Sequence, residues 1–318
     1  AAGEINSAII EYKNAVSKSP DDKEIRIHLA DAYFKIGLMA QAEKEFNKAL
    51  KLGADINAFQ DRLIKALFLD SQYEAVTKMT PADSLTLEAQ ATILFYKGAA
   101  YGQLEEPEKY KEYLQRCKSL GGNSPFSNLA ELYLQSETDL HDGLTGVSDL
   151  LQNNPNFTEG HLLQGRLAFA AHKFELAESA YQAHLTLLPG VTFVKLPLAN
   201  TMIKTGKLSE AKGHLKEILK NIPHQPFANQ LMALVKFQEK DFEGALRHAE
   251  MVTRNSAGND ANSLIAGLAA FQRKNYELSH NYLRSVVNKL DDTHPAKKVF
   301  AIVQLQLGYS LEATNTLG

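Results

Sequence analysis

Small side chains recur along this chain at a fixed interval among alternating apolar and polar positions. Ala8 and Ala42 are 34 residues apart. The same interval separates the small residues of the second half, which are Ala177, Ala211, Ala245, Ser279 and Ala313. Apolar residues recur around them at the spacing of one helix face. Such a period predicts stacked pairs of antiparallel helices.

The clearest unit runs from Lys23 to about Asp55, with Gly37 at the expected turn between its two helices. Its second helix is predicted from the series Ala42, Phe46, Ala49 and Leu50. The order of residue types in this unit is a small residue, an aromatic residue, Gly and then Ala-x3-Phe-x2-Ala. This pattern resembles that of the tetratricopeptide repeat (TPR) family. The resemblance implies an all-α fold, a right-handed α-α superhelix of antiparallel helix pairs. We expect about eight full repeats plus two partial ones.

The register of the repeat has two irregularities. The spacing between Ala42 and Ala177 is one position short of four full periods, which predicts a single deletion in the middle. The chain contains no tryptophan, although tryptophan often opens the first helix of this motif. The corresponding positions hold Arg26, Gln60, Leu94, His161, Lys195, Asn229 and Ser263. The family resemblance therefore depends on the period and on the small-residue positions.

We expect residues 1–318 to form a single solenoid, because a repeat array grows by addition of units. Gly3 aligns with Gly37, and Gly318 falls midway through a predicted second helix, so both ends cut a repeat. This indicates a fragment of a longer array or ends that are covered by partners. The turn-forming stretch at residues 119–125 is either a bend in the superhelix or an ordinary loop between repeats.

Composition and charge argue against several classes of function. The net charge is −3, with 34 basic and 37 acidic residues interspersed, so nucleic acid is not an expected partner. The apolar runs are far shorter than the roughly 20 residues of a transmembrane helix. The histidines and the single Cys117 lack the spacing of metal ligands. A phosphate-binding loop needs a first Gly and a final Ser or Thr, and both are missing around Thr205-Gly206-Lys207-Leu208. From these observations together we predict no cofactor, metal or catalytic residue.

A second periodic series offers candidate binding residues. Phenylalanine follows the usual aromatic position of the predicted first helices at Phe34, Phe68, Phe169, Phe237 and Phe271. In the tetratricopeptide fold this face lines or borders the concave groove, where rigid rings could hold a partner's peptide or helix. The alternative is that the rings turn into the core between helices. Polar groove-side candidates in the same register include Lys65, Arg166, Asn200 and Gln230.

Two stretches resemble a particular subfamily. They are residues 48–55 (Lys-Ala-Leu-Lys-Leu-Gly-Ala-Asp) and residues 264–272 (Leu-Ile-Ala-Gly-Leu-Ala-Ala-Phe-Gln). Both are similar to the TPR-repeat proteins and lipoproteins of the PEP-CTERM/exosortase sorting systems of Gram-negative bacteria. The resemblance implies a cell-envelope, periplasmic protein linked to exopolysaccharide production and protein sorting. A signal or lipidated cysteine is absent from this fragment.

Three functions follow from these observations. The first is a protein–protein interaction scaffold of the cell envelope, with an implied role in exosortase-linked sorting or in exopolysaccharide assembly or export. The second is a polysaccharide-binding module, because aromatic and polar side chains also bind sugars. The third is an enzyme whose site the sequence does not reveal. The continuous repeat and the lack of a catalytic constellation favour the scaffold, with other proteins as partners.

Overall fold

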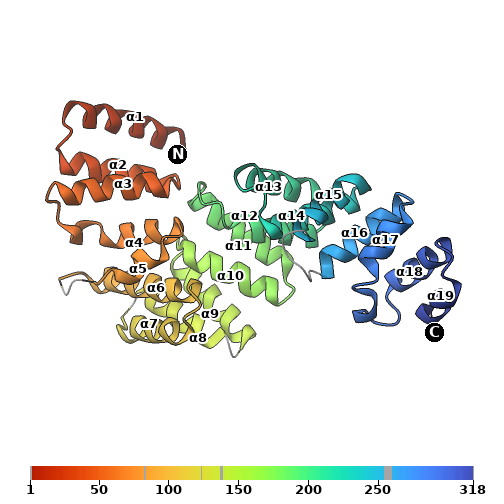
Figure 1. Ribbon diagram of the computed structural model, residues 1–318. Helices are drawn as coiled ribbons and strands as arrows, with labels where there is room; N and C mark the ends of the chain where they lie inside the picture. The colour runs from red at the N-terminus through yellow and green to blue at the C-terminus, as the bar shows by residue number, and fades with distance from the viewer. Residues whose placement is uncertain (1, 82–83, 123, 137–138, 254–259, 318) are drawn as a thin grey trace. The chain divides into compact units, whose positions relative to one another are not determined.

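The computed structural model describes residues 2–81, 84–122, 124–136, 139–253 and 260–317 (Figure 1). Over these residues the chain forms helices α1 to α19 and two short 3-10 helices, with no strand. It divides into two compact units, which we call unit 1 (residues 1–194) and unit 2 (residues 195–318). The single solenoid over residues 1–318 stays a prediction.

Unit 1 contains the first eleven α-helices. They are α1 (Ala2–Lys18), α2 (Lys23–Lys35), α3 (Met39–Lys51), α4 (Gln60–Leu69), α5 (Tyr73–Lys78), α6 (Leu87–Gln103), α7 (Pro107–Ser119), α8 (Pro125–Ser136), α9 (Leu140–Asn153), α10 (Thr158–Ala170) and α11 (Phe174–Leu187), with a 3-10 helix at Ile56–Ala58. Segment 119–125 joins α7 to α8, which pack against each other. Residue 123 lies outside the described residues, and the bend there stays a prediction.

Unit 2 contains the remaining helices. They are α12 (Lys195–Lys204), α13 (Leu208–Asn221), α14 (Pro226–Gln238), α15 (Phe242–Thr253), α16 (Asp260–Gln272), α17 (Tyr276–Leu283), α18 (Pro295–Gln306) and α19 (Ser310–Leu317), with a 3-10 helix at Val287–Lys289. Across both units α2 to α17 form eight complete pairs, preceded by α1 and followed by a ninth pair of α18 with the short α19. The predicted all-α architecture of paired helices is confirmed.

The period of the sequence is visible in the helix boundaries. The second helices of successive pairs begin at Met39, Tyr73, Pro107, Leu140, Phe174, Leu208, Phe242, Tyr276 and Ser310. Every interval equals the period that separates Ala8 from Ala42, except the interval from Pro107 to Leu140, which is one position shorter. The predicted single deletion is therefore confirmed, and it lies between the start of α7 and the start of α9.

Apart from the α8–α9 turn, whose residues 137–138 lie outside the described residues, the turn inside each pair uses the same backbone conformation. One residue of the turn has a positive φ, between 57° and 85°, at Gly37, Ser71, Glu105, His172, Gly206, Lys240, Lys274 and Gly308. Only glycine adopts this left-handed region without a steric cost, which is about 1 kcal/mol for other residues. The turn recurs even where glycine is absent, so the packing of the two helices fixes it. Gly206 is thus a turn residue of the α12–α13 pair.

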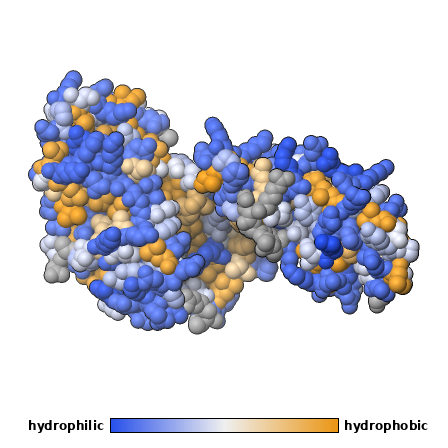
Figure 2. All heavy atoms as spheres, in the orientation of Figure 1, coloured by the Kyte–Doolittle hydropathy of each residue, from blue (hydrophilic) through white to orange (hydrophobic). Residues whose placement is uncertain are grey.

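The small residues of the period are buried between helices from Ala42 onward, whereas Ala8 on α1 is half-buried. Ala42, Ala177, Ala211, Ala245 and Ser279 are fully buried, and Ala313 is 2% exposed. The Ser279 hydroxyl donates to the Gly267 carbonyl at 2.9 Å across the pair. Larger side chains at these positions would separate the helices, because protein interiors are close-packed. On the face drawn in Figure 2, hydrophobic residues are scattered among hydrophilic ones.

Except for Leu94, the positions of the missing tryptophan hold polar side chains, and three of these form the same hydrogen bond to the loop before their helix. Each donates a hydrogen bond to the carbonyl of the proline six residues earlier. The donors are Arg26 Nε to Pro20 at 2.8 Å, His161 Nε2 to Pro155 at 2.8 Å and Asn229 Nδ2 to Pro223 at 2.9 Å. These bonds satisfy a carbonyl that the loop between repeats leaves without a helical partner.

Within unit 1, the turn between α2 and α3 meets the loop after α11. A Cβ atom on Gly190 would lie 1.9 Å from the Ile36 carbonyl oxygen, and one on Gly37 would lie 2.3 Å from the Gly190 Cα. No other residue than glycine fits at Gly190 unless the backbone moves. This contact joins segments that are far apart in the sequence, and it holds the first and fifth complete pairs together.

Candidate functional site

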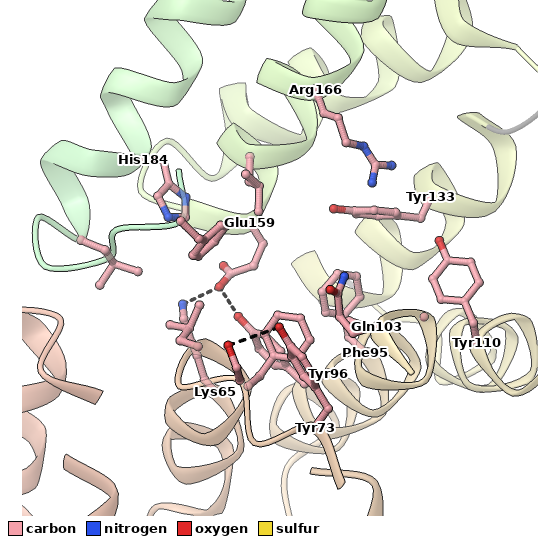
Figure 3. Close-up of a pocket in the computed structure, with 18 of the residues that line it drawn as sticks. Lys65, Tyr73, Phe95, Tyr96, Gln103, Tyr110, Tyr133, Glu159, Arg166 and His184 are labelled. Carbon is pink, nitrogen blue, oxygen red and sulfur yellow. Dashed lines mark hydrogen bonds and ion pairs between the residues drawn. The ribbon is translucent and has the colours of Figure 1, made fainter. Parts of the chain in front are cut away.

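Aromatic and polar side chains of unit 1 converge around a pocket of about 590 Å³. Its wall comes mainly from α4, α6 and α10, with Tyr133 from α8; these are the first helices of four successive pairs, and Figure 3 shows side chains of these helices converging on it. Labelled in Figure 3 are Lys65, Tyr73, Phe95, Tyr96, Gln103, Tyr110, Tyr133, Glu159, Arg166 and His184. We call this the unit 1 pocket.

Helical spacing explains why these residues share one wall. On α10, Glu159, Leu162 and Arg166 are three and four residues apart, which places them on one face. On α4, Lys65 and Phe68 have the same spacing. The first helices therefore direct one face into the pocket while the opposite face packs against the second helices.

A buried ion pair connects α4 to α10 at the inner end of the pocket. Lys65 Nζ lies 2.5 Å from Glu159 Oε1. The Tyr96 hydroxyl of α6 donates to the same oxygen at 2.5 Å, and the Thr158 hydroxyl donates to Glu159 Oε2 at 2.8 Å. Glu159 is only 7% exposed and Tyr96 only 3%. Every carboxylate oxygen thus has a donor, which is the condition under which a buried charge is tolerated.

This arrangement keeps Glu159 ionised. Burial alone raises the pKa of the Glu159 carboxyl, but the Lys65 charge and the hydrogen bonds from Lys65, Tyr96 and Thr158 outweigh it and lower the pKa to about 2. Burial and the adjacent Glu159 carboxylate raise the pKa of the Tyr96 phenol well above its ordinary value. At neutral pH the cluster therefore holds one carboxylate, one ammonium and one protonated phenol.

His184 forms part of the same wall and is almost fully buried, with 2% of its surface exposed. Its Nδ1 lies 2.8 Å from the Thr158 carbonyl oxygen. Because a carbonyl only accepts, Nδ1 must carry the proton. Burial lowers the pKa of the imidazole, so the ring is neutral and its Nε2 is an acceptor. Nε2 has no hydrogen-bond partner among the described residues.

Arg166 is the other cation of the pocket wall, and it differs from Lys65. Its guanidinium lies over the ring of Tyr133, 4.8 Å from the ring centroid, and extends from α10 toward the pocket in Figure 3. The side chain is exposed and has no carboxylate partner among the described residues. Stacking on the ring holds the guanidinium plane while leaving its N–H groups available.

The apolar part of the wall is a connected group of rings. Phe68 and Tyr96 have centroids 5.1 Å apart, and Phe68 also contacts Tyr73 at 5.4 Å. Phe95 contacts Tyr96 and Tyr133, each with a centroid distance of 5.6 Å. These aromatic side chains come from four different helices, so their positions are set by the packing of the pairs and not by one flexible loop.

The structure places the predicted phenylalanine series mainly across the turns inside the pairs. Four of the rings contact the aromatic ring five residues later, in the pairs Phe68–Tyr73, Phe169–Phe174, Phe237–Phe242 and Phe271–Tyr276. All five phenylalanines are half-buried. Phe68 lines the unit 1 pocket, and Phe34 lines a neighbouring pocket of about 430 Å³ that shares Lys65 and Glu159 with it.

The other predicted groove residues are divided between the two units. Arg166 lines the unit 1 pocket. Asn200 on α12 and Gln230 on α14 are half-buried residues of unit 2, as are Phe237 and Phe271. A binding role for these residues of unit 2 stays a prediction.

Sequence reasoning missed most of the pocket wall. Tyr96, Tyr133 and Glu159 are not members of either periodic series. Lys65 was a groove candidate, but its partner Glu159 lies three helix pairs further along the chain. The one available signal was the spacing of Glu159, Leu162 and Arg166 on a single helical face. That spacing identifies a face without identifying what faces it.

The described residues contain no group of three or more His, Cys, Asp or Glu side chains arranged to hold a metal ion. Burial raises the pKa of the Cys117 thiol to about 12, so the thiol is protonated at neutral pH. Its sulfur donates to the Ala91 carbonyl at 3.2 Å. Among the helices that the structure describes, none combines the length and apolar character needed to cross a bilayer.

Comparison with known proteins identifies the repeat. The family model described as tetratricopeptide repeat matches residues 1–63. This match covers the partial first repeat and the clearest unit, and the same period of helix pairs continues to α19. Residues 1–63 therefore match the tetratricopeptide repeat. Proteins built from this repeat are generally non-enzymatic scaffolds that bind other proteins or peptides on an extended concave surface.

One curated relative is similar over most of this chain. It is the tetratricopeptide repeat and J domain-containing co-chaperone DNJ1 of Fusarium oxysporum f. sp. lycopersici, 25% identical over 259 residues. The match covers 80% of this chain and 45% of the relative, so the chain spans less than half of the relative's length.

Two solved structures share the fold. The PilF protein of Pseudomonas aeruginosa superposes with a TM-score of 0.51 at 16% identity, covering 75% of this chain and 99% of that one. PilW, a type IV pilus biogenesis factor, gives a TM-score of 0.51 at 15% identity, covering 72% of this chain and 98% of that one. At this identity the likeness shows the fold alone.

Proposed function

We propose that this protein is an interaction scaffold that binds a segment of another protein in the unit 1 pocket. The observation that carries the proposal is the wall of the pocket, where aromatic rings from successive first helices surround about 590 Å³. Aromatic side chains supply large contact areas at a small entropic cost, and they dominate the energetics of protein interfaces. The first-helix face is also the face that the repeat architecture leaves open to a ligand.

The chemistry of the pocket supports binding more than catalysis. Its one buried carboxylate, Glu159, is paired with Lys65 and has a pKa of about 2, so it is a poor proton acceptor at neutral pH. The nearby His184 is neutral, and its Nδ1 proton is committed to the Thr158 carbonyl. These groups serve to hold the pocket wall in place.

The experiment is selection of peptides from a phage-displayed random library on the whole chain, followed by binding measurements on variants. Ala99 is a half-buried residue of the pocket wall on α6, and Ala99→Trp fills part of the pocket. Thr145→Trp adds the same ring to an exposed position of the second helix α9. We expect Ala99→Trp to abolish binding of the selected peptides and Thr145→Trp to leave it unchanged. Equal binding by both variants would refute the pocket as the binding site.

Calorimetry with exopolysaccharide separates the scaffold from a carbohydrate-binding module. The scaffold proposal predicts heat with the selected peptides and none with the polysaccharide. The opposite result is binding heat with the polysaccharide that is lost in Ala99→Trp, and no peptide binding in the pocket. That result would show that the pocket binds a sugar and not a protein.

We further propose that the protein acts in the bacterial cell envelope, on its periplasmic side, in exosortase-linked protein sorting or in exopolysaccharide assembly or export. The support is the resemblance of residues 48–55 and 264–272 to the TPR-repeat lipoproteins of those systems. Fractionation of the native host with an antibody against this chain tests the location. Recovery in the envelope fraction is the expected result, and recovery in the cytosolic fraction would contradict it.

A further inference from the structure

The two cationic side chains of the unit 1 pocket differ in whether an acidic side chain of the protein neutralises them. Lys65 is neutralised by Glu159 within the protein, at 2.5 Å. The Arg166 guanidinium lies over the face of Tyr133 and near the Tyr181 phenol, and none of its N–H groups donates to an acceptor among the described residues. A guanidinium carries five N–H donors in a planar fork that matches the two oxygens of a carboxylate. The pocket therefore offers a cation that is already oriented and is not satisfied by the described part of the protein.

The position of Arg166 places this cation beside apolar surface. Arg166 lies one helical turn from Leu162 on α10, and the ring of Tyr133 beneath it contacts Phe95. An anion held by Arg166 would therefore have aromatic and aliphatic side chains within reach of the residues next to it. This combination favours a ligand that carries a negative charge and an apolar group side by side.

Glu105 also lacks an ion-pair partner among the described residues of the wall, and it is exposed on the left-handed turn after α6. It belongs to the α6–α7 pair, whereas Arg166 belongs to the α10–α11 pair, with the α8–α9 pair between them in the chain. An acidic ligand group is attracted to Arg166 and repelled by Glu105. The two charges thus favour one orientation of a bound segment over the reverse.

We propose that the unit 1 pocket recognises an acidic side chain next to an aromatic or large aliphatic one within a segment of the partner protein. The carboxylate of the partner's Asp or Glu lies on the Arg166 guanidinium, and the apolar side chain packs against Phe68, Tyr73 and Phe95. This inference depends on the proposed function, because it specifies the chemistry of the segment that the pocket binds. A single arginine fits one side-chain carboxylate, and the described residues of the wall offer no second unpaired cation for a chain terminus.

The test uses the peptides selected from the random phage library, synthesised with an amidated C-terminus so that only side chains supply carboxylates. Binding to the whole chain is measured by fluorescence anisotropy for wild type, Arg166→Gln, Arg116→Gln and Ala99→Trp. Arg116 is the matched control, because its guanidinium also lies 4.8 Å from a tyrosine centroid, that of Tyr113, but on the second helix α7 and outside the pocket.

We expect the selected peptides to share an Asp or Glu adjacent to an aromatic or leucine residue. Arg166→Gln should weaken their binding by about tenfold or more, the effect of losing a hydrogen-bonded charge pair, and Arg116→Gln should not change it. Replacing the peptide's acid by its amide should cause the same loss in wild type and no further loss in Arg166→Gln. Arg166 is exposed and makes no ion pair with the described residues, so the variant retains the fold.

Two outcomes would overturn the inference, and they differ in what they say about the pocket. If Ala99→Trp abolishes binding while Arg166→Gln binds as wild type does, or if the selected peptides lack acidic residues, the pocket binds peptides without the proposed carboxylate recognition. If Ala99→Trp has no effect on any selected peptide, the proposed function fails together with this inference.

Discussion

Replacing Glu159 by glutamine tests the buried ion pair of unit 1. Glutamine is nearly isosteric, but its single carbonyl oxygen can accept from only one of the Tyr96 and Thr158 hydroxyls, and it leaves the Lys65 ammonium without a counter-charge. The Lys65 side chain is only 16% exposed, so water replaces the lost carboxylate poorly. Removing one partner of a buried pair typically costs about 3–5 kcal/mol.

The pKa of Glu159 gives an independent magnitude. The ordinary value is 4.5 and the folded protein lowers it to about 2. At about 1.4 kcal/mol per pH unit this difference corresponds to about 3 kcal/mol of stability at neutral pH. A group with a lowered pKa stabilises the fold fully above its unfolded pKa. The stabilisation should therefore be complete above about pH 4.5 and disappear as the pH falls toward about 2.

The assay is urea unfolding followed by far-ultraviolet circular dichroism, repeated from neutral to acidic pH. Glu159→Gln should be less stable than wild type by about 3 kcal/mol at neutral pH, and the difference should shrink below about pH 4.5. Hydrogen exchange should increase in α4, α6 and α10 and stay unchanged in unit 2, because repeats contact mainly their neighbours. Glu106→Gln, which removes an exposed carboxylate paired with Lys109, is the control and should leave the unfolding curve unchanged.

A companion variant separates the charge from the packing. Lys65→Met, Tyr96→Phe and Glu159→Leu together remove the polar cluster and keep its approximate volume, so they should regain at least half of the lost stability. An unfolding curve for Glu159→Gln that matches wild type at neutral pH would refute the reasoning. So would a stability difference that stays constant as the pH falls through 4.5.

Three further predictions follow from the packing. Gly190→Ala should destabilise unit 1 by about 1–3 kcal/mol and raise hydrogen exchange at the α2–α3 turn, because the new Cβ would lie 1.9 Å from the Ile36 carbonyl oxygen. Unchanged exchange at this turn would show that the contact is not maintained. Ala211→Trp should separate α12 from α13 and lower the urea midpoint, whereas the exposed Ser209→Trp should not; identical midpoints would contradict the repeat register. Cys117, fully buried with a pKa of about 12, should react with a thiol reagent only after unfolding, so rapid labelling of the native protein would contradict its placement.

The fold could be predicted from the sequence because its signal is short-range and repeated. Ala211 and Ala245 are fully buried in the structure for the same reason that they recur in the sequence, since a small side chain is needed where two helices approach. The shortened interval from Pro107 to Leu140 also shortens the spacing of the small residues by one position, which made it visible in the sequence. Each repeat constrains the spacing of its neighbours, so one missing residue is detectable over several repeats.

The pocket could be predicted only in part, because it depends on how successive pairs are placed in space. Arg166 and Phe68 were found from their register on first helices, and both line the pocket. The pairing of Lys65 with Glu159 joins helices from different pairs, and no periodic rule connects those two positions. The orientation of Phe169 was also open to two readings, and its contact with Phe174 depends on the turn between α10 and α11.

The most direct test of the central claim is a crystal structure of the whole chain with one of the selected peptides. The account predicts the peptide in the unit 1 pocket, with its apolar side chain against Phe68 and Phe95 and its acidic side chain on Arg166. A peptide bound to the outer second helices or to unit 2, with the unit 1 pocket unoccupied, would contradict it.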